Sequence, residues 1–147
     1  MGTVDKSASV RGSMTSDRQV GPARVLIVEG YGQSREGLTF SLHSQGLSVE
    51  TAAEYMEAIR KMKEGRFAVA IIDVDLPAAP NSELSGWDLA RIFRALHPRA
   101  ALILVTAEWR AELGIEAERL RDCCLIEKPI NPAELRAMVR ALQSDSG

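Results

Sequence analysis

The chain has 147 residues, of which 46% are apolar and 26% charged, and its formal net charge is −2. This length suits one domain with a sound core, and the apolar share excludes general disorder. The lack of a basic excess argues against a nucleic-acid surface. The sequence has no apolar run of about 18 residues, so no membrane-spanning helix is expected. The first residues carry no apolar signal-peptide core, and the adjacent Cys123 and Cys124 fit a reduced, cytoplasmic setting.

Residues 1–23 are rich in serine, glycine and charge and show no sustained apolar period. We interpret them as a flexible leader. Apolar patterning begins at residue 24 and continues to the last helix, so we expect one domain over residues 24–143.

Five short apolar runs alternate with five stretches of helical periodicity. A third helix starting near Trp87 has the clearest apolar stripe, and the last helix opens with an N-cap, a proline and an acid at Asn131, Pro132 and Glu134. The expected strands are residues 24–28, 48–51, 68–72, 101–106 and 123–126. The expected helices are residues 33–45, 53–64, 87–96, 108–118 and 131–142.

Alternating strands and helices indicate an α/β fold, with a parallel sheet covered by helices on both faces. The apolar run that ends at Ile72 has no polar interruption, which is typical of a strand buried on both faces. We predict a doubly wound, flavodoxin-like domain of five parallel strands in the order 2-1-3-4-5, with right-handed crossovers.

A polar residue follows four of the five apolar runs at the point where each strand ends: Glu29, Asp73, Thr106 and Lys128. Ligands of open α/β sheets bind outside the carboxyl ends of the strands. The pattern therefore predicts a site containing two acids, a hydroxyl and an amine. The alternative for each residue is that it only solvates a strand end.

These strand ends resemble the receiver domain of bacterial two-component response regulators. The resemblance covers about residues 24–142, and Gly86-Trp87-Asp88-Leu89 is similar to the family's glycine-led entry to its third helix. The other matching segments, in chain order, are Val-Leu-Ile-Val-Glu29, Asp73-Val-Asp75-Leu-Pro77, Thr106-Ala107 and Lys128-Pro129.

The resemblance implies that Asp73 accepts a phosphoryl group from a histidine kinase or a phosphotransfer protein. It assigns the Thr106 hydroxyl and the Lys128 ammonium to the phosphoryl oxygens, and it implies a cis Lys128–Pro129 bond. The metal is expected to be Mg²⁺, held weakly by Glu29, Asp73 and the backbone carbonyl of Asp75. Such a domain is a signalling module and not an enzyme, beyond self-catalysed phosphorylation and dephosphorylation.

Two positions and one loop depart from the family pattern. Gly30 stands where a second acid usually follows the first strand, so we expect weaker Mg²⁺ binding. Leu125 replaces the aromatic residue whose rotamer usually tracks phosphorylation. The loop before Gly86 is about four residues longer than usual. These departures bear on switching and not on the fold.

The leading hypothesis is a single-domain response regulator, because few residues follow position 144, so that output passes to an unknown downstream protein. No nucleic-acid or membrane partner is expected, and a homodimer through the fourth helix, fifth strand and fifth helix is an option. The alternative is a degenerate receiver that acts as a phosphorylation-independent interaction module. A flavin-binding protein is a third option, disfavoured because no glycine- or hydroxyl-rich phosphate loop follows the first strand.

Overall fold

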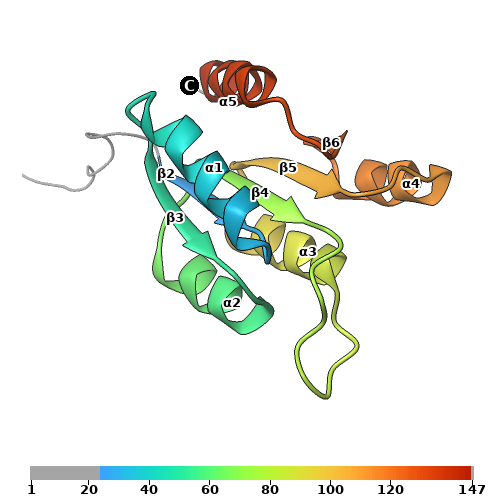
Figure 1. Ribbon diagram of the computed structural model, residues 1–147. Coiled ribbons are helices and arrows are strands. Elements are labelled where there is room, and N and C mark those ends of the chain that lie inside the picture. Colours follow the sequence, from blue (N-terminus) through green and yellow to red (C-terminus); the bar gives the residue numbers. More distant parts are fainter. Residues whose placement is uncertain (1–23, 147) are drawn as a thin grey trace, which may run out of the picture.

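The computed structural model describes residues 24–146, in which five strands alternate with five helices (Figure 1). The leader expected at residues 1–23 lies outside the described residues. The strands are β2 (Arg24–Val28), β3 (Ser48–Ala52), β4 (Val69–Asp73), β5 (Ala101–Thr106) and β6 (Cys123–Glu127). The helices are α1 (Gly32–His43), α2 (Tyr55–Glu64), α3 (Gly86–Leu96), α4 (Ala111–Leu120) and α5 (Pro132–Ser146).

All four strand pairings are parallel, and the sheet order is β3-β2-β4-β5-β6. This is the predicted order 2-1-3-4-5. The direction of winding reverses between β2 and β4, so the carboxyl ends of these two strands lie side by side at the switch point. The register pairs Val28 with Ile72 and Asp73 with Val105. The fold therefore brings the ends of β2, β4 and β5 to one edge.

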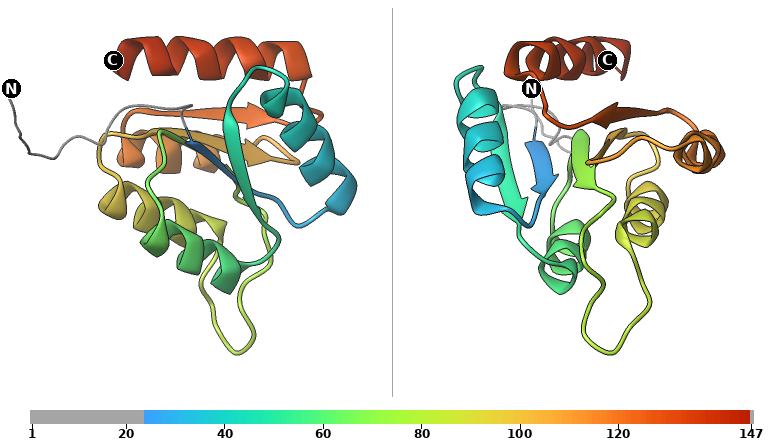
Figure 2. Two further views of the ribbon diagram at one scale, coloured as in Figure 1. Left: turned by 90° about the vertical axis from the view of Figure 1, so that its left-hand side faces the viewer. Right: turned by 45° about the vertical axis from the view of Figure 1, so that its right-hand side comes forward.

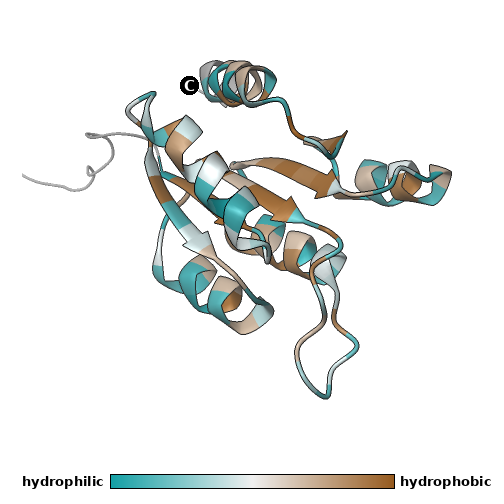
Figure 3. Ribbon diagram, in the orientation of Figure 1, coloured by the Kyte–Doolittle hydropathy of each residue, from teal (hydrophilic) through white to brown (hydrophobic). Residues whose placement is uncertain are grey.

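The helices cover the two faces of the sheet in separate layers (Figure 2). Helices α1 and α5 pack on one face through Leu38, Leu42, Leu135 and Val139. Helices α2 and α3, with the end of α4, pack on the other face, where Phe93 is fully buried. In Figure 3 the central strands β4 and β5 are brown, the hydrophobic end of the scale, whereas the edge strand β3 is pale to teal. Burial of both faces explains why the central strands lack polar alternation.

Strand boundaries agree with the sequence prediction within one residue, whereas some helix ends differ. Helix α1 ends at His43, two residues early, because Gly46 adopts φ 82° and its N–H donates to the His43 carbonyl. Helix α2 begins at Tyr55 and not at residue 53, because the Glu54 side chain caps it. Helix α5 runs to Ser146, beyond the domain end expected at residue 143, since neither glycine nor proline interrupts it.

The helix predicted at residues 108–118 is wrong at both ends, because α4 spans Ala111–Leu120. The Glu108 N–H donates to the Thr106 hydroxyl and the Trp109 N–H to the Glu127 carboxylate, so these residues form a loop. At the other end, burial of Leu120 against the core extends the helix. Tertiary contacts therefore decide both boundaries.

Candidate functional site at the carboxyl ends of the strands

Asp73 is the last residue of β4, and the residue is only 7% exposed. Its Oδ1 accepts the Asp75 N–H at 2.8 Å, and its carbonyl accepts the Leu76 N–H at 3.1 Å. Such a turn is typical of an aspartate at a strand end. The turn fixes the carboxylate and leaves Oδ2 for other partners.

Gly86 allows α3 to lie directly against this turn. A Cβ atom at Gly86 would stand 2.6 Å from the Asp73 carbonyl oxygen and 2.6 Å from the Val74 Cα, which is too close for any other residue. Ser85 and Asp88 complete the entry as a capping box, with the Ser85 N–H donating to Asp88 at 2.6 Å. Steric contact with the Asp73 turn therefore explains why a glycine stands at the start of α3.

Lys128 joins the two acids that the sequence places at the ends of β2 and β4. Its Nζ lies 3.0 Å from Glu29 Oε1 and 3.3 Å from Asp73 Oδ2. The Lys128 N–H donates to the Thr106 carbonyl, and the Lys128–Pro129 bond is cis, as predicted. Glu29 is 3% exposed, so two buried carboxylates share one ammonium.

Burial and charge act in opposite directions on this group. Desolvation raises the pKa of Asp73, and the Glu29 charge adds to this, while the Asp75 N–H and Lys128 partly offset it. Burial alone would lower the pKa of Lys128, but its hydrogen bond to Glu29 and the charges of both acids raise it. Lys128 is therefore held in its charged form. Burial makes Asp73 easier to protonate than an aspartate in water.

Thr106 is buried at the end of β5, but its hydroxyl makes no hydrogen bond to Asp73 in the described structure. Thr106 Oγ1 lies 3.1 Å from Asp75 Oδ2 and 3.1 Å from the Glu108 carbonyl oxygen. The Ala107 N–H donates to the same Asp75 oxygen at 2.7 Å. The expected hydroxyl is thus at the site, turned toward Asp75.

A cavity of about 530 Å³ opens in front of Asp73 and Lys128. Gly30 and residues 77–80 of the long β4–α3 loop form part of its wall, and Figure 1 shows this loop extending away from the sheet. Arg35 donates to the carbonyls of Glu29 and Gly30 and holds the chain at this rim. The acidic edge is therefore open to a ligand of phosphoryl size.

Glu29 and Asp73 suit a hard cation, because each presents carboxylate oxygens and both lie within 3.3 Å of one point, Lys128 Nζ. The Asp75 carboxylate does not join them, since it faces Thr106 and Ala107. Within residues 24–146, no three histidine, cysteine or acidic side chains converge as a metal site. The donor set thus fits Mg²⁺ bound by two carboxylates, with other oxygens completing its shell.

The structure brings together Glu29, Asp73 and Lys128 and places Thr106 and Asp75 beside them. Sequence reasoning missed the Asp75 carboxylate, because only its backbone carbonyl was considered. Its spacing of two residues from Asp73 at a strand end was the available signal. It also missed Arg35, for which an arginine in the first turn of α1 was the only hint.

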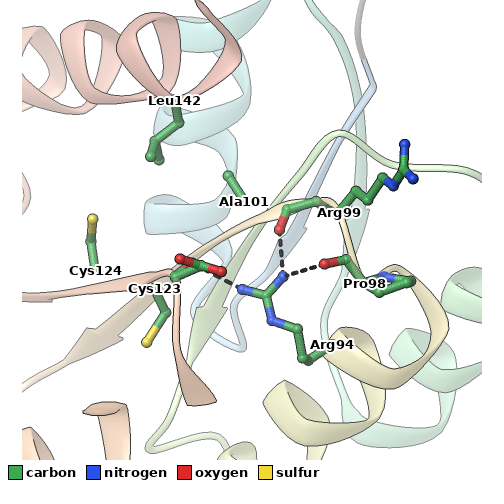
Figure 4. Close-up of a pocket in the computed structure, with 9 residues that line it drawn as sticks. Arg94, Pro98, Arg99, Ala101, Cys123, Cys124 and Leu142 are labelled. Atoms are coloured by element: carbon green, nitrogen blue, oxygen red, sulfur yellow. Dashed lines mark hydrogen bonds between the residues drawn. The ribbon is translucent and has the colours of Figure 1, made fainter. Parts of the chain in front are cut away.

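The opposite end of the sheet has a cavity of about 590 Å³ lined by Arg94, Cys123, Cys124 and Leu142 (Figure 4). Both cysteines are free thiols and half-buried. The Arg94 guanidinium donates to four backbone carbonyls around this cavity. These hydrogen bonds hold the backbone at this end of the sheet, which is the end opposite the acidic site.

A family model described as the response regulator receiver domain matches residues 25–140. The transcriptional regulatory protein CreB of Escherichia coli is 31% identical, over 80% of this chain and 49% of its own length. FixJ of Azorhizobium caulinodans is 30% identical over 80% of this chain and 53% of its own. The chain thus spans about half the length of the curated relatives it matches.

Solved structures show the same fold. A CheY-like receiver domain protein from Methanospirillum hungatei gives a TM-score of 0.78 at 25% identity, covering 86% of this chain and 97% of that one. The chemotaxis protein CheY4 of Vibrio cholerae gives 0.73 at 27% identity, covering 83% and 99%. Within the described residues, no helix combines the length and apolar character needed to cross a bilayer.

Proposed function

Because this chain belongs to the response regulator receiver domain family, we propose that Asp73 accepts a phosphoryl group from a histidine kinase or a phosphotransfer protein and that the domain then signals through a downstream protein. The observation that carries the proposal is the buried Asp73 carboxylate, held 3.3 Å from Lys128 Nζ beside a cavity of about 530 Å³. Receiver domains of two-component systems are phosphorylated signalling modules and bind Mg²⁺ at their acidic pocket.

The transfer makes one bond and breaks one. An Asp73 oxygen attacks phosphorus as the P–N bond of a phosphohistidine breaks, and the electron pair of that bond leaves with the imidazole, which takes up a proton. Phosphoryl transfer depends mostly on positioning and on stabilising charge at the oxygens. Lys128 supplies a fixed positive charge at this place, and the Asp75 N–H orients the attacking carboxylate.

Glu29, Asp73 and the Asp75 carbonyl are the proposed ligands of Mg²⁺, which neutralises charge on the phosphoryl oxygens when it is bound. Since Gly30 offers no carboxylate, we propose that the affinity is low. Thr106 becomes a partner of the phosphoryl group only when its hydroxyl turns from Asp75.

Incubation with a small acyl phosphate and Mg²⁺, followed by intact mass measurement, tests the proposal. The wild type should gain one phosphoryl group, and Asp73→Asn should gain none. Glu83→Gln, an exposed acid in the loop between β4 and α3, is the matched control and should be modified like the wild type. An unmodified wild type at saturating donor would refute phosphoacceptance.

The second candidate is a degenerate receiver that binds its partner without phosphorylation. Gly30 favours it, because the family acid that normally completes the metal site is missing. A partner that binds the wild type and Asp73→Asn equally well would select this function.

The proposed setting is the cytoplasm, consistent with two free, half-buried thiols. A homodimer through α4, β6 and α5 is proposed because Ile115 of α4, and Trp109 in the loop just before α4, leave apolar surface exposed. If sedimentation gives a monomer both with and without the acyl phosphate, the dimer is excluded.

A further inference from the structure

The Asp75 carboxylate holds the start of the loop between β5 and α4. Its Oδ2 lies 2.7 Å from the Ala107 nitrogen and 3.1 Å from Thr106 Oγ1, so one oxygen takes two donors. We name this pair of hydrogen bonds the Asp75 latch. Thr106 is the last residue of β5 and Ala107 follows it, whereas Asp75 lies two residues after the end of the neighbouring strand β4.

The latch is built directly onto the phosphoacceptor. The Asp75 N–H donates to Asp73 Oδ1 at 2.8 Å. One residue therefore orients the Asp73 carboxylate through its backbone and binds Thr106 and Ala107 through its side chain. A carboxylate oxygen and a phosphoryl oxygen are the same kind of acceptor for O–H and N–H groups. The Thr106 hydroxyl has a single proton, for which the Asp75 carboxylate and the Glu108 carbonyl, each 3.1 Å away, already compete. A phosphoryl oxygen would be a third acceptor for that proton.

We propose that Asp75 is an internal competitor of the phosphoryl group: its carboxylate occupies the Thr106 hydroxyl and the Ala107 N–H until a phosphoryl group on Asp73 displaces it. This inference rests on the proposed phosphorylation of Asp73. It makes Asp75 a positioning residue of the site, with a role separate from that of its backbone carbonyl.

Two features would allow a phosphoryl group to displace the Asp75 carboxylate from the latch. Asp75 is exposed, so water can solvate its carboxylate when the donors leave. The loop it holds continues through Glu108 to Trp109, whose N–H donates to Glu127 at the end of β6. Displacing the latch therefore frees residues 107–110, which connect the site to β6 and α4.

Three variants separate the hydrogen bonds from the charge. Asp75→Ala removes both bonds and the charge, whereas Asp75→Asn keeps an acceptor oxygen in place and removes only the charge. Glu83→Ala removes one exposed negative charge from the β4–α3 loop without touching Thr106 or Ala107. All leave the Asp75 backbone carbonyl position intact.

The first measurement is amide hydrogen exchange of Ala107 by NMR, without phosphodonor. Exchange should be about tenfold faster in Asp75→Ala, faster to a smaller degree in Asp75→Asn, and unchanged in Glu83→Ala. The second is the rate of modification by an acyl phosphate at saturating Mg²⁺. We expect that rate to rise several-fold in Asp75→Ala, with Asp75→Asn in between.

Each outcome decides the matter. A phosphorylation rate that is unchanged or lower in Asp75→Ala, with a wild type that is modified, overturns the competitor alone. An equal rate increase in both Asp75 variants assigns the effect to charge and also overturns the latch. If neither wild type nor Asp75→Ala is modified, phosphorylation of Asp73 fails and the competitor falls with it. Modification of Asp75→Ala alone supports both.

Discussion

At the level of single residues, the site contains two buried acids and one lysine. Glu29 and Asp73 contribute two negative charges and Lys128 one positive charge, so the group carries a net negative charge in a desolvated place. Removing charged groups from water is costly unless they are paired. This unbalanced negative charge makes the site less stable than a neutral one. Binding of a cation, or protonation of Asp73, would remove the imbalance.

The Gly30→Asp variant should bind Mg²⁺ more tightly. A Cβ at Gly30 would meet Leu76 Cδ1 at 3.5 Å and the Ala53 oxygen at 3.6 Å, which are ordinary contacts, so a Cβ is tolerated there. An added carboxylate should strengthen binding by about 1–3 kcal/mol, the scale of a hydrogen bond to a charged group. Calorimetric titration at one ionic strength measures it. Gly30→Asn is the neutral control, and equal affinity in all three proteins would contradict the prediction.

The Asp73→Asn variant should be more stable than the wild type at neutral pH. Because burial raises the pKa of Asp73 above its unfolded value, the stability due to its protonated form is present below about pH 4 and is lost as the pH rises through the folded pKa. A neutral amide avoids this loss. Urea unfolding at several pH values should show a difference at pH 7 that shrinks on acidification. A less stable Asp73→Asn at pH 7 would mean that the Lys128 ion pair outweighs desolvation.

At the level of elements, α3 is tied to the sheet at both of its ends. Its start lies against Asp73 through Gly86, and its last turn carries Arg94. The Arg94 guanidinium bonds the carbonyls of Pro98, Ala100, Arg121 and Asp122, as Figure 4 shows in part. Arg121 and Asp122 have positive φ values of 55° and 50°, so this arginine holds a turn that the backbone alone disfavours.

Replacing Arg94 by lysine should destabilise the domain by about 1–3 kcal/mol, because a lysine cannot reach four carbonyls with a planar fork. Arg99→Lys is the matched control, since Arg99 lines the same cavity from the exposed side. Urea unfolding measures both variants. If Arg94→Lys loses no more stability than Arg99→Lys, the carbonyl bonds do not hold the turn.

At the level of the whole molecule, the acidic site and the α4–β6–α5 surface are connected through the loop that follows β5. Thr106 lies at the end of β5, and the loop's Trp109 packs near Gly114 of α4. Leu125 of β6 is partly buried against the core and has neither a hydroxyl nor a ring edge. It cannot exchange a polar contact when Thr106 moves.

We therefore expect small changes on the α4–β6–α5 surface when a phosphoryl mimic such as beryllofluoride binds at Asp73. Amide exchange should change in residues 107–110 and little within β6 and α5, because Leu125 has no hydroxyl or ring edge that could follow a movement of Thr106. The untreated protein and Asp73→Asn with the mimic are the controls. Strong slowing of exchange across β6 and α5 would show that another residue transmits the signal.

The sequence by itself determined the alternation of elements, the sheet order and the residues at the strand ends. Uninterrupted apolar runs mark strands buried on both faces, and a parallel sheet must bring their carboxyl ends to one edge. This is why Glu29, Asp73 and Lys128 were predicted together, and Lys128 contacts both acids in the folded domain. Strand limits were also predictable, because a polar residue or a turn ends each run.

Only the tertiary structure decided what the side chains of that edge do to one another. The turn of Asp75 toward Thr106 and Ala107, and the start of α4 after Arg110, depend on contacts between residues about 18 to 32 positions apart. Local periodicity carries no information about such contacts, because hydrogen bonding and burial across strands are fixed only when the sheet forms. The ordering of donors around Asp73 is therefore a property of the folded molecule.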